Sequence, residues 1–129
     1  MTLPFELRQK SRQRTVLDDG SEIGLFLPRG SVLRGGDLLL SDNGSVILVQ
    51  AAAESVSTVT AGDPHLLLRA AYHLGNRHVS LQIGANWLRY QHDHVLDDMV
   101  IKLGLEITIE LATFEPESGA YHHGHHNHA

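Results

Sequence analysis

The sequence contains no cysteine, which excludes disulfide bonds and thiolate-bound metal clusters and fits a reducing cytoplasm. No stretch is long and apolar enough to span a membrane, and residues 1–10 lack the hydrophobic core of a signal peptide. Basic residues are also few. The ten Lys and Arg are outnumbered by fifteen Asp and Glu, and the formal charge of −5 argues against non-specific nucleic-acid binding. We therefore expect a cytoplasmic protein that binds neither membranes nor nucleic acid.

Histidine, by contrast, is abundant, with ten residues in the chain. Five of them fall within the last eight residues: His122, His123, His125, His126 and His128. Neutral imidazole is a standard ligand for nickel, copper and zinc. A purification tag is the alternative, but engineered tags are usually uninterrupted, whereas Gly124 and Asn127 break this run. We therefore expect residues 118–129 to be a native, disordered tail that binds a divalent metal.

Residues 1–52 have the pattern of short strands separated by turns. Strands are predicted over 22–27, 37–40 and 45–51. Asn43-Gly44, between the last two, is a strong hairpin signal because both residues tolerate a positive φ. No segment in this half carries a convincing helical stripe, so it is predicted to be a small all-β domain.

From residue 53 onward, predicted strands alternate with predicted helices. Asp63-Pro64 supplies an N-cap followed by a proline at the first helical position, and a second helix is expected to begin near Asp93 or His94. Strands are predicted over 54–60, 79–83, 86–90 and 105–112. The resulting β-α-β-β-α-β order predicts a ferredoxin-like domain over 53–117, with two helices on one face of an antiparallel sheet. The predicted fold class is therefore α+β.

The two predicted helices match each other position for position. The apolar positions of the first helix are Leu66, Leu67, Ala70, Ala71 and Leu74, and they align in that order with Val95, Leu96, Met99, Val100 and Leu103 of the second. The same alignment matches Gly75 with Gly104. We expect each helix to bury the same stripe and to end at its glycine.

Two of the remaining histidines have unremarkable surroundings in the predicted fold. His65 lies in the first turn of the first helix and is expected at the surface. His73 lies at the edge of the apolar stripe, where a residue that packs its ring is more common than a metal ligand.

Three other histidines lie in predicted loops. His78 follows Gly75-Asn76-Arg77, and a loop on a rigid scaffold commonly carries function, although a loop histidine taken alone is more often simply solvated. His92 and His94 are an i, i+2 pair, so in extended backbone both rings point to the same side and could reach one ion. Asp93 between them could cap the helix or orient a ring.

The segments around these histidines resemble a known family. AYHLGNRHVSLQI (71–83) and LRYQHDHVLDDMVIKLG (88–104) closely resemble the urease accessory nickel metallochaperones, which bring Ni²⁺ to the urease activation complex. The resemblance covers essentially the whole chain. It includes the turns at 27–30 and 34–37 and the segments 114–117 and 119–121.

The resemblance implies a non-catalytic homodimer, with a β-rich peptide-binding-type domain over 1–52 and a metal-binding and dimerisation domain over 53–117. His78 from two protomers would bind one Ni²⁺, and His92 and His94 would form an additional metal-binding pair. The cargo would be Ni²⁺, with Cu²⁺ and Zn²⁺ also able to bind. The expected partners are the urease apoprotein and the urease accessory proteins, including the GTPase.

Two further matches to the family concern its variable positions. His122–His128 would be the variable histidine-rich tail, which is short compared with the longest family tails. His73 matches a histidine present in some members. Ser80 stands where a proline is frequent, and we attach no functional weight to this difference.

Other functions are less well supported by the sequence. A metallohydrolase would need an open site with three fixed ligands and a catalytic carboxylate, and none is evident. An RNA-binding module of the same topology would need stacking aromatics, which residues 79–83 lack. A general nickel, zinc or copper storage protein is the closest competitor, because it differs only in whether the ion is delivered.

Overall fold

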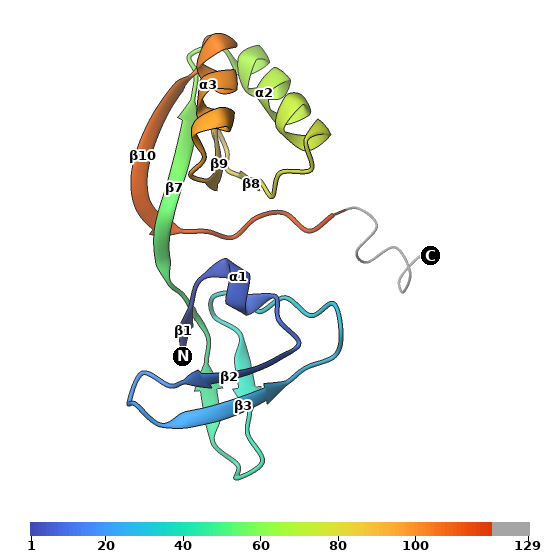
Figure 1. The fold of residues 1–129 in the computed structure, drawn as a ribbon, viewed down its shortest axis with the longest axis vertical. Helices are drawn as coiled ribbons and strands as arrows, with labels where there is room; N and C mark the ends of the chain where they lie inside the picture. Colours follow the sequence, from blue (N-terminus) through green and yellow to red (C-terminus); the bar gives the residue numbers. More distant parts are fainter. Residues whose placement is uncertain (120–129) are drawn as a thin grey trace. The chain divides into compact units, whose positions relative to one another are not determined.

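The computed structural model describes residues 1–119, which form two compact units, Met1–Ala52 and the part of the chain from Ala53 onward (Figure 1). Each unit combines small sheets with helix and has a hydrophobic core of its own. The fold class is α+β, as predicted. Among the described residues, no helix has the length and apolarity needed to cross a membrane.

The first unit is built from three two-stranded sheets. Its elements are β1 (Thr2–Leu3), α1 (Phe5–Arg8), β2 (Arg12–Val16), β3 (Glu22–Phe26), β4 (Leu38–Leu40), β5 (Val46–Leu48) and β6 (Gln50–Ala51). β1 pairs with β6 in parallel, whereas β2–β3 and β4–β5 are antiparallel. The hairpin predicted at Asn43-Gly44 is confirmed, since it joins β4 to β5 with Gly44 at φ 88°.

The prediction of an all-β first half was wrong in one respect, because α1 is a helical turn. Its last residue, Arg8, is fully buried. The guanidinium donates to the carbonyl oxygen of Leu3 at 3.0 Å and to that of Leu33 at 3.1 Å. Contacts with residues distant in the sequence therefore hold this turn, which is too short to show a helical periodicity.

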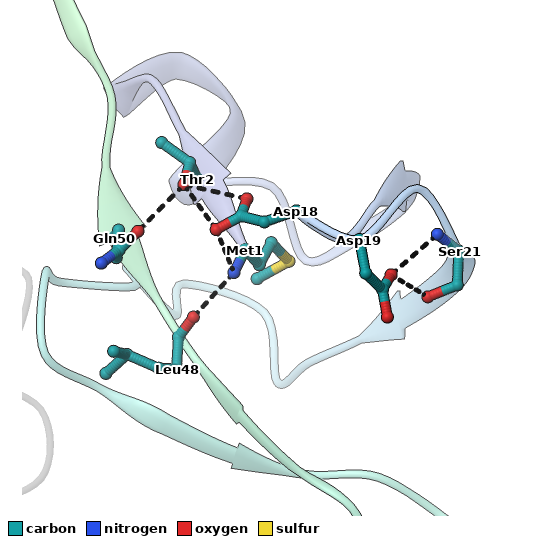
Figure 2. Close-up of polar contacts among 7 residues, drawn as sticks. All are labelled: Met1, Thr2, Asp18, Asp19, Ser21, Leu48 and Gln50. Carbon is teal, nitrogen blue, oxygen red and sulfur yellow. Dashed lines mark hydrogen bonds and ion pairs between the residues drawn. The ribbon is translucent and has the colours of Figure 1, made fainter.

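Polar contacts tie the beginning of the chain to β5, β6 and the turn after β2 (Figure 2). The amino group of Met1 donates to the carbonyl oxygen of Leu48 at 2.8 Å and lies 3.6 Å from Asp18 Oδ2. Thr2 Oγ1 lies 3.0 Å from Asp18 Oδ1 and 3.2 Å from Gln50 Oε1. These contacts hold β1 beside β6.

The β2–β3 turn is stabilised by a local network, also drawn in Figure 2. Asp19 Oδ1 accepts hydrogen bonds from the hydroxyl of Ser21 at 2.6 Å and from its backbone N–H at 2.9 Å. Both bonds stabilise the charged carboxylate, so they lower the pKa of Asp19.

The second unit places two helices on one face of a four-stranded antiparallel sheet (Figure 1). Its elements are β7 (Ala53–Thr60), α2 (Pro64–Asn76), β8 (Gln82–Ile83), β9 (Trp87–Gln91), α3 (His94–Lys102) and β10 (Glu106–Thr113). The strand order is β10-β7-β9-β8. The buried core between helices and sheet contains Val59, Ala70, Leu74, Leu81, Leu88, Tyr90, Leu96, Val100 and Leu105.

Both helices begin as predicted. Asp63 caps α2 by accepting a hydrogen bond from the backbone N–H of His65 at 2.9 Å, and Pro64 occupies the first helical turn. Asp93 caps α3 by accepting from the backbone N–H groups of Val95 at 2.8 Å and Leu96 at 3.1 Å. Each cap satisfies amide groups that a helix start leaves without a partner inside the helix.

The predicted end of the first helix was wrong. Gly75 lies inside the last turn of α2, and the left-handed residue that closes the helix is His78, at φ 58°. The backbone N–H of His78 donates to the Gly75 carbonyl at 3.0 Å, and that of Val79 donates to the Leu74 carbonyl at 3.2 Å. This pair of bonds is the Schellman motif, with His78 where glycine is usual.

The second helix closes by the same pattern, with a glycine at the left-handed position. Gly104 has φ 99°, and its N–H donates to the Ile101 carbonyl at 2.9 Å. The N–H of Leu105 lies 3.4 Å from the Val100 carbonyl oxygen. At the C-terminal ends of the two helices, the counterpart of Gly104 is therefore His78, and not Gly75 as the sequence pattern indicated.

Aligning the two left-handed residues also aligns the buried helical residues. It matches Ala70 with Leu96 and Leu74 with Val100, and all four are buried. Val95, which the alignment of the sequence patterns placed in the core stripe, is 61% exposed. Because α2 has 13 residues and α3 has nine, no single alignment can match both their starts and their ends.

Candidate metal centre

His78 presents an exposed imidazole at the C-terminal end of α2. Its backbone is held by the closing bonds of the helix, so only the side-chain torsions remain variable. The residue lines an open hollow of about 340 Å³. The other lining residues are Val79, Ser80, Leu81, Ile83, Glu117, Ser118 and Gly119.

The segment that follows β10 forms part of the same hollow. Its backbone is tied to the strand region around β8, because the N–H of Glu115 donates to Gln82 Oε1 at 2.9 Å and the N–H of Glu117 donates to the Leu81 carbonyl at 2.8 Å. The chain therefore reaches Gly119 at the hollow that contains His78.

The five predicted tail ligands, His122, His123, His125, His126 and His128, lie outside the described residues. Their covalent distance from the hollow is nevertheless short. His122 follows Gly119 by three residues, which at full extension span about 10 Å. The histidine-rich sequence thus begins three residues after Gly119, which lines the same hollow as His78.

His92 and His94 lie on either side of Asp93, in the turn from β9 to α3, and the structure brings their rings together. The ring centroids are 5.1 Å apart, with the planes at 76° in an edge-to-face arrangement. His94 is exposed, whereas the side chain of His92 is 23% exposed. The pair therefore offers two imidazoles at one place on the surface.

Two polar side chains that the sequence patterns did not indicate contact the Nδ1 atom of His92. Its Nδ1 lies 3.1 Å from Asp97 Oδ2 and 3.2 Å from Ser57 Oγ. Asp97 Oδ1 in turn accepts a hydrogen bond of 2.5 Å from the hydroxyl of Tyr90. Burial and the neighbouring Asp97 carboxylate raise the pKa of Tyr90 above its ordinary value, so this hydroxyl keeps its proton.

The carboxylate that contacts His92 is therefore Asp97, further along the chain in α3. Asp93, which the sequence offered for either role, serves as the helix cap. The presence of Asp97 in the first turn of a helix was the only available signal, and that position is common for acidic residues.

The two other histidines lie where they were expected. His65 is exposed in the first turn of α2. His73 is half-buried, and its ring packs edge-to-face against Tyr72 with centroids 5.3 Å apart.

Within residues 1–119, no three His, Cys, Asp or Glu side chains converge as a metal site would require. Zinc sites usually need four ligands, and other divalent ions often take more. An ion held by His78, or by His92 and His94, would therefore need donors from outside this part of one chain.

Comparison with known proteins identifies the family. The chain matches the N-terminal domain of the UreE urease accessory protein over residues 1–52 and its C-terminal domain over residues 54–129. It is 62% identical over 121 residues to the urease accessory protein UreE of Alkalilimnicola ehrlichii, covering 94% of this chain and 74% of that protein. With UreE of Pseudomonas putida W619, identity is 61% over 128 residues, covering 98% and 80% of the two chains. With that of Proteus mirabilis HI4320, it is 56% over 121 residues, covering 94% and 75%. The chain therefore belongs to the UreE family of urease accessory proteins.

Proposed function

We propose that this chain is a homodimeric, non-catalytic carrier that binds Ni²⁺ and delivers it to the urease activation complex for assembly of the urease metallocentre. The observation that supports this best is the hollow shared by His78 and Glu117–Gly119. It joins an imidazole on a fixed backbone to the start of a histidine-rich segment. Such a site can collect an ion and still exchange its ligands.

The principal site requires a second protomer. One His78 supplies a single ring, but a two-fold axis beside it brings the same residue from the partner, because an isologous interface meets itself. Tail imidazoles and water complete the coordination. Tail ligands exchange one at a time, which provides a stepwise route for transfer of the ion.

His92 and His94 form an additional site of lower affinity. Their adjacent rings act as one chelating unit, and imidazole nitrogen also suits Cu²⁺ and Zn²⁺. Divalent-ion affinity usually rises from Ni²⁺ to Cu²⁺, so ligand type alone does not select nickel. Cellular availability and the partner complex supply that selectivity.

The absence of thiolates suits release as well as capture. A carrier with micromolar affinity, about −8 kcal/mol, holds its ion while leaving transfer feasible. Cysteine ligands bind soft and borderline metals tightly and are open to oxidation, and this chain has none. The same lack of cysteine fits action in the cytoplasm.

We assign residues 53–117 to a ferredoxin-like metal-binding and dimerisation domain, and residues 118–129 to the metal-gathering tail. The strand order β10-β7-β9-β8 and the two helices on one face support the first assignment. Residues 1–52 form a peptide-binding-type domain for the urease apoprotein or an accessory protein such as the GTPase. Phe26 and Leu40, each 77% exposed beside an apolar hollow, support that role.

Reconstituted urease activation at limiting nickel tests the proposal. The wild-type protein should raise the yield of active urease, and a His78→Gly variant should not. His65→Gln, which changes an exposed histidine at the other end of α2, is the matched control and should behave as the wild type. Nickel binding without any gain in urease activation would instead indicate the storage function.

A further inference from the structure

Three buried polar residues, Ser57, Tyr90 and Asp97, lie next to the Nδ1 side of the His92 ring and are linked to it by hydrogen bonds. Ser57 on β7 and Tyr90 on β9 are directly opposed in the antiparallel pair, and both are fully buried. Asp97, 7% exposed in the first turn of α3, lies beside them. Among the described residues, no buried side-chain nitrogen or oxygen lacks a hydrogen-bond partner.

The direction of each bond follows from which groups can donate. The hydroxyl of Tyr90 donates to Asp97 Oδ1, because a carboxylate only accepts. Ser57 Oγ lies 3.2 Å from His92 Nδ1, and a serine hydroxyl can accept a hydrogen bond from a ring N–H.

The carboxylate beside His92 Nδ1 can only accept a hydrogen bond. Asp97 Oδ2 at 3.1 Å therefore requires that this nitrogen carry the hydrogen, and Ser57 Oγ at 3.2 Å can accept from it as well. In a neutral imidazole the other nitrogen, Nε2, then carries the lone pair. A metal ion binds through that lone pair, and a hydrogen-bonded second nitrogen fixes the orientation of the ring.

We propose that Asp97, held by the Tyr90 hydroxyl, is a positioning residue that keeps His92 in the Nδ1–H tautomer and presents its Nε2 to the metal. His92 is then the primary ligand of the His92–His94 pair, and the exposed His94 joins as the second. This inference rests on the proposed metal binding by that pair. It adds a carboxylate, Asp97, that accepts a hydrogen bond from the ring of His92 while the other ring nitrogen binds the metal.

The tautomer can be measured directly on the full-length, metal-free protein. Long-range ¹H–¹⁵N correlation spectra at about pH 8, where an unperturbed imidazole is neutral, distinguish protonated from unprotonated ring nitrogens. His92→Ala identifies the His92 signals by their loss. We expect the Nδ1–H form in the wild type, and a wild-type ring protonated at Nε2 would overturn the proposal.

Asp97→Asn should reverse the tautomer. The hydroxyl of Tyr90 still donates, so the amide oxygen of the new residue faces Tyr90 and its NH₂ group faces His92. Nδ1 then becomes the acceptor, and Nε2 carries the hydrogen. Affinity for Ni²⁺, followed at the His92 signals, should fall about 10- to 100-fold, as is typical when the partner of a ligating histidine is lost.

Asp98→Asn is the matched control, because it makes the same chemical change at the next residue of α3, which is exposed. It should leave both tautomer and affinity unchanged. Should Asp97→Asn fail to fold, Tyr90→Phe removes the hydroxyl that holds Asp97 and should weaken Ni²⁺ binding at His92 to a smaller extent. Wild-type tautomer and affinity in whichever of these variants folds would refute the positioning role.

The same spectra separate this inference from the proposed function. If Ni²⁺ leaves the wild-type His92 signals unchanged, the metal-binding role of the pair fails. The metal-free tautomers of the wild type and of Asp97→Asn still decide whether Asp97 positions the ring.

Discussion

Replacing His78 with glycine should make the metal-free protein more stable while removing its principal metal ligand. His78 holds φ 58° at the closing position of α2. An L-residue loses about 1–2 kcal/mol in this conformation, and glycine loses almost nothing. Glycine also gains about 0.4–1 kcal/mol of backbone freedom in the unfolded chain, which acts in the opposite direction. The net expectation is a gain of about 0.5–1 kcal/mol.

Thermal unfolding of the metal-free protein measures this difference. For a unit the size of residues 53–119, about 0.5–1 kcal/mol corresponds to a rise of about 2–8 °C in Tm. His78→Ala removes the same ring but keeps a side chain in the left-handed region, so it should be no more stable than the wild type. Calorimetric titration with Ni²⁺ should show that both variants lose the site.

Gly104→Ala is the reciprocal test at the matching end of α3. A Cβ at Gly104 would lie 3.8 Å from Leu66 Cδ1, an ordinary contact, so the variant isolates the backbone effect of φ 99°. It should lose about 1 kcal/mol of unfolding free energy. A His78→Gly protein that unfolds below the wild-type Tm would refute the reasoning, because the imidazole would then make contacts worth more than the strain.

Asp93→Ala should lower the free energy of unfolding by about 1 kcal/mol, because two amide groups at the start of α3 lose their acceptor. Asp98→Ala, on the exposed side of the same helix, is the control and should change the free energy of unfolding little. In metal titrations, His92→Ala with His94→Ala should lose little more binding than either single variant, because the rings act together; additive losses would show that they bind independently. Deletion of residues 122–129 should lower the number of Ni²⁺ ions bound in equilibrium dialysis without shifting Tm, and equal stoichiometry would exclude a metal-gathering tail.

The features that the sequence predicted correctly depend on neighbouring residues. Asp63 and Asp93 cap their helices through amides two or three residues away, and Asn43-Gly44 forms its hairpin through its own backbone preferences. Such signals act within one turn of chain, so they can be recognised in the sequence alone.

The features that were missed depend on contacts between distant segments. α1 is held by the Arg8 guanidinium, whose acceptor on Leu33 is 25 residues away. The end of α2 was misjudged because Gly75 offered a glycine close to the end of the apolar stripe, whereas the helix continues to Asn76 and closes on a histidine. The left-handed backbone at the closing position of a helix favours glycine, and His78 is an exception to this preference.

The candidate site shows the same division. The closeness of the His92 and His94 rings was predicted, because alternation along an extended chain is a local property. The contact of His92 with Asp97 and Ser57 was not, because it requires β7, β9 and α3 to pack together. Likewise, the hollow that joins His78 to Glu117–Gly119 brings together segments that are far apart in sequence.

The left-handed backbone of His78 also affects the entropy of metal capture. A ligand on a mobile loop must have its backbone ordered when an ion binds, at a cost of about 1–2 kcal/mol for each residue fixed. The two bonds that close α2 order the backbone of His78 during folding, so capture restricts only the rotation of the ring. In the proposed dimer this preorganisation applies to both His78 rings. The backbone strain at His78 is therefore offset by a smaller loss of entropy each time an ion binds.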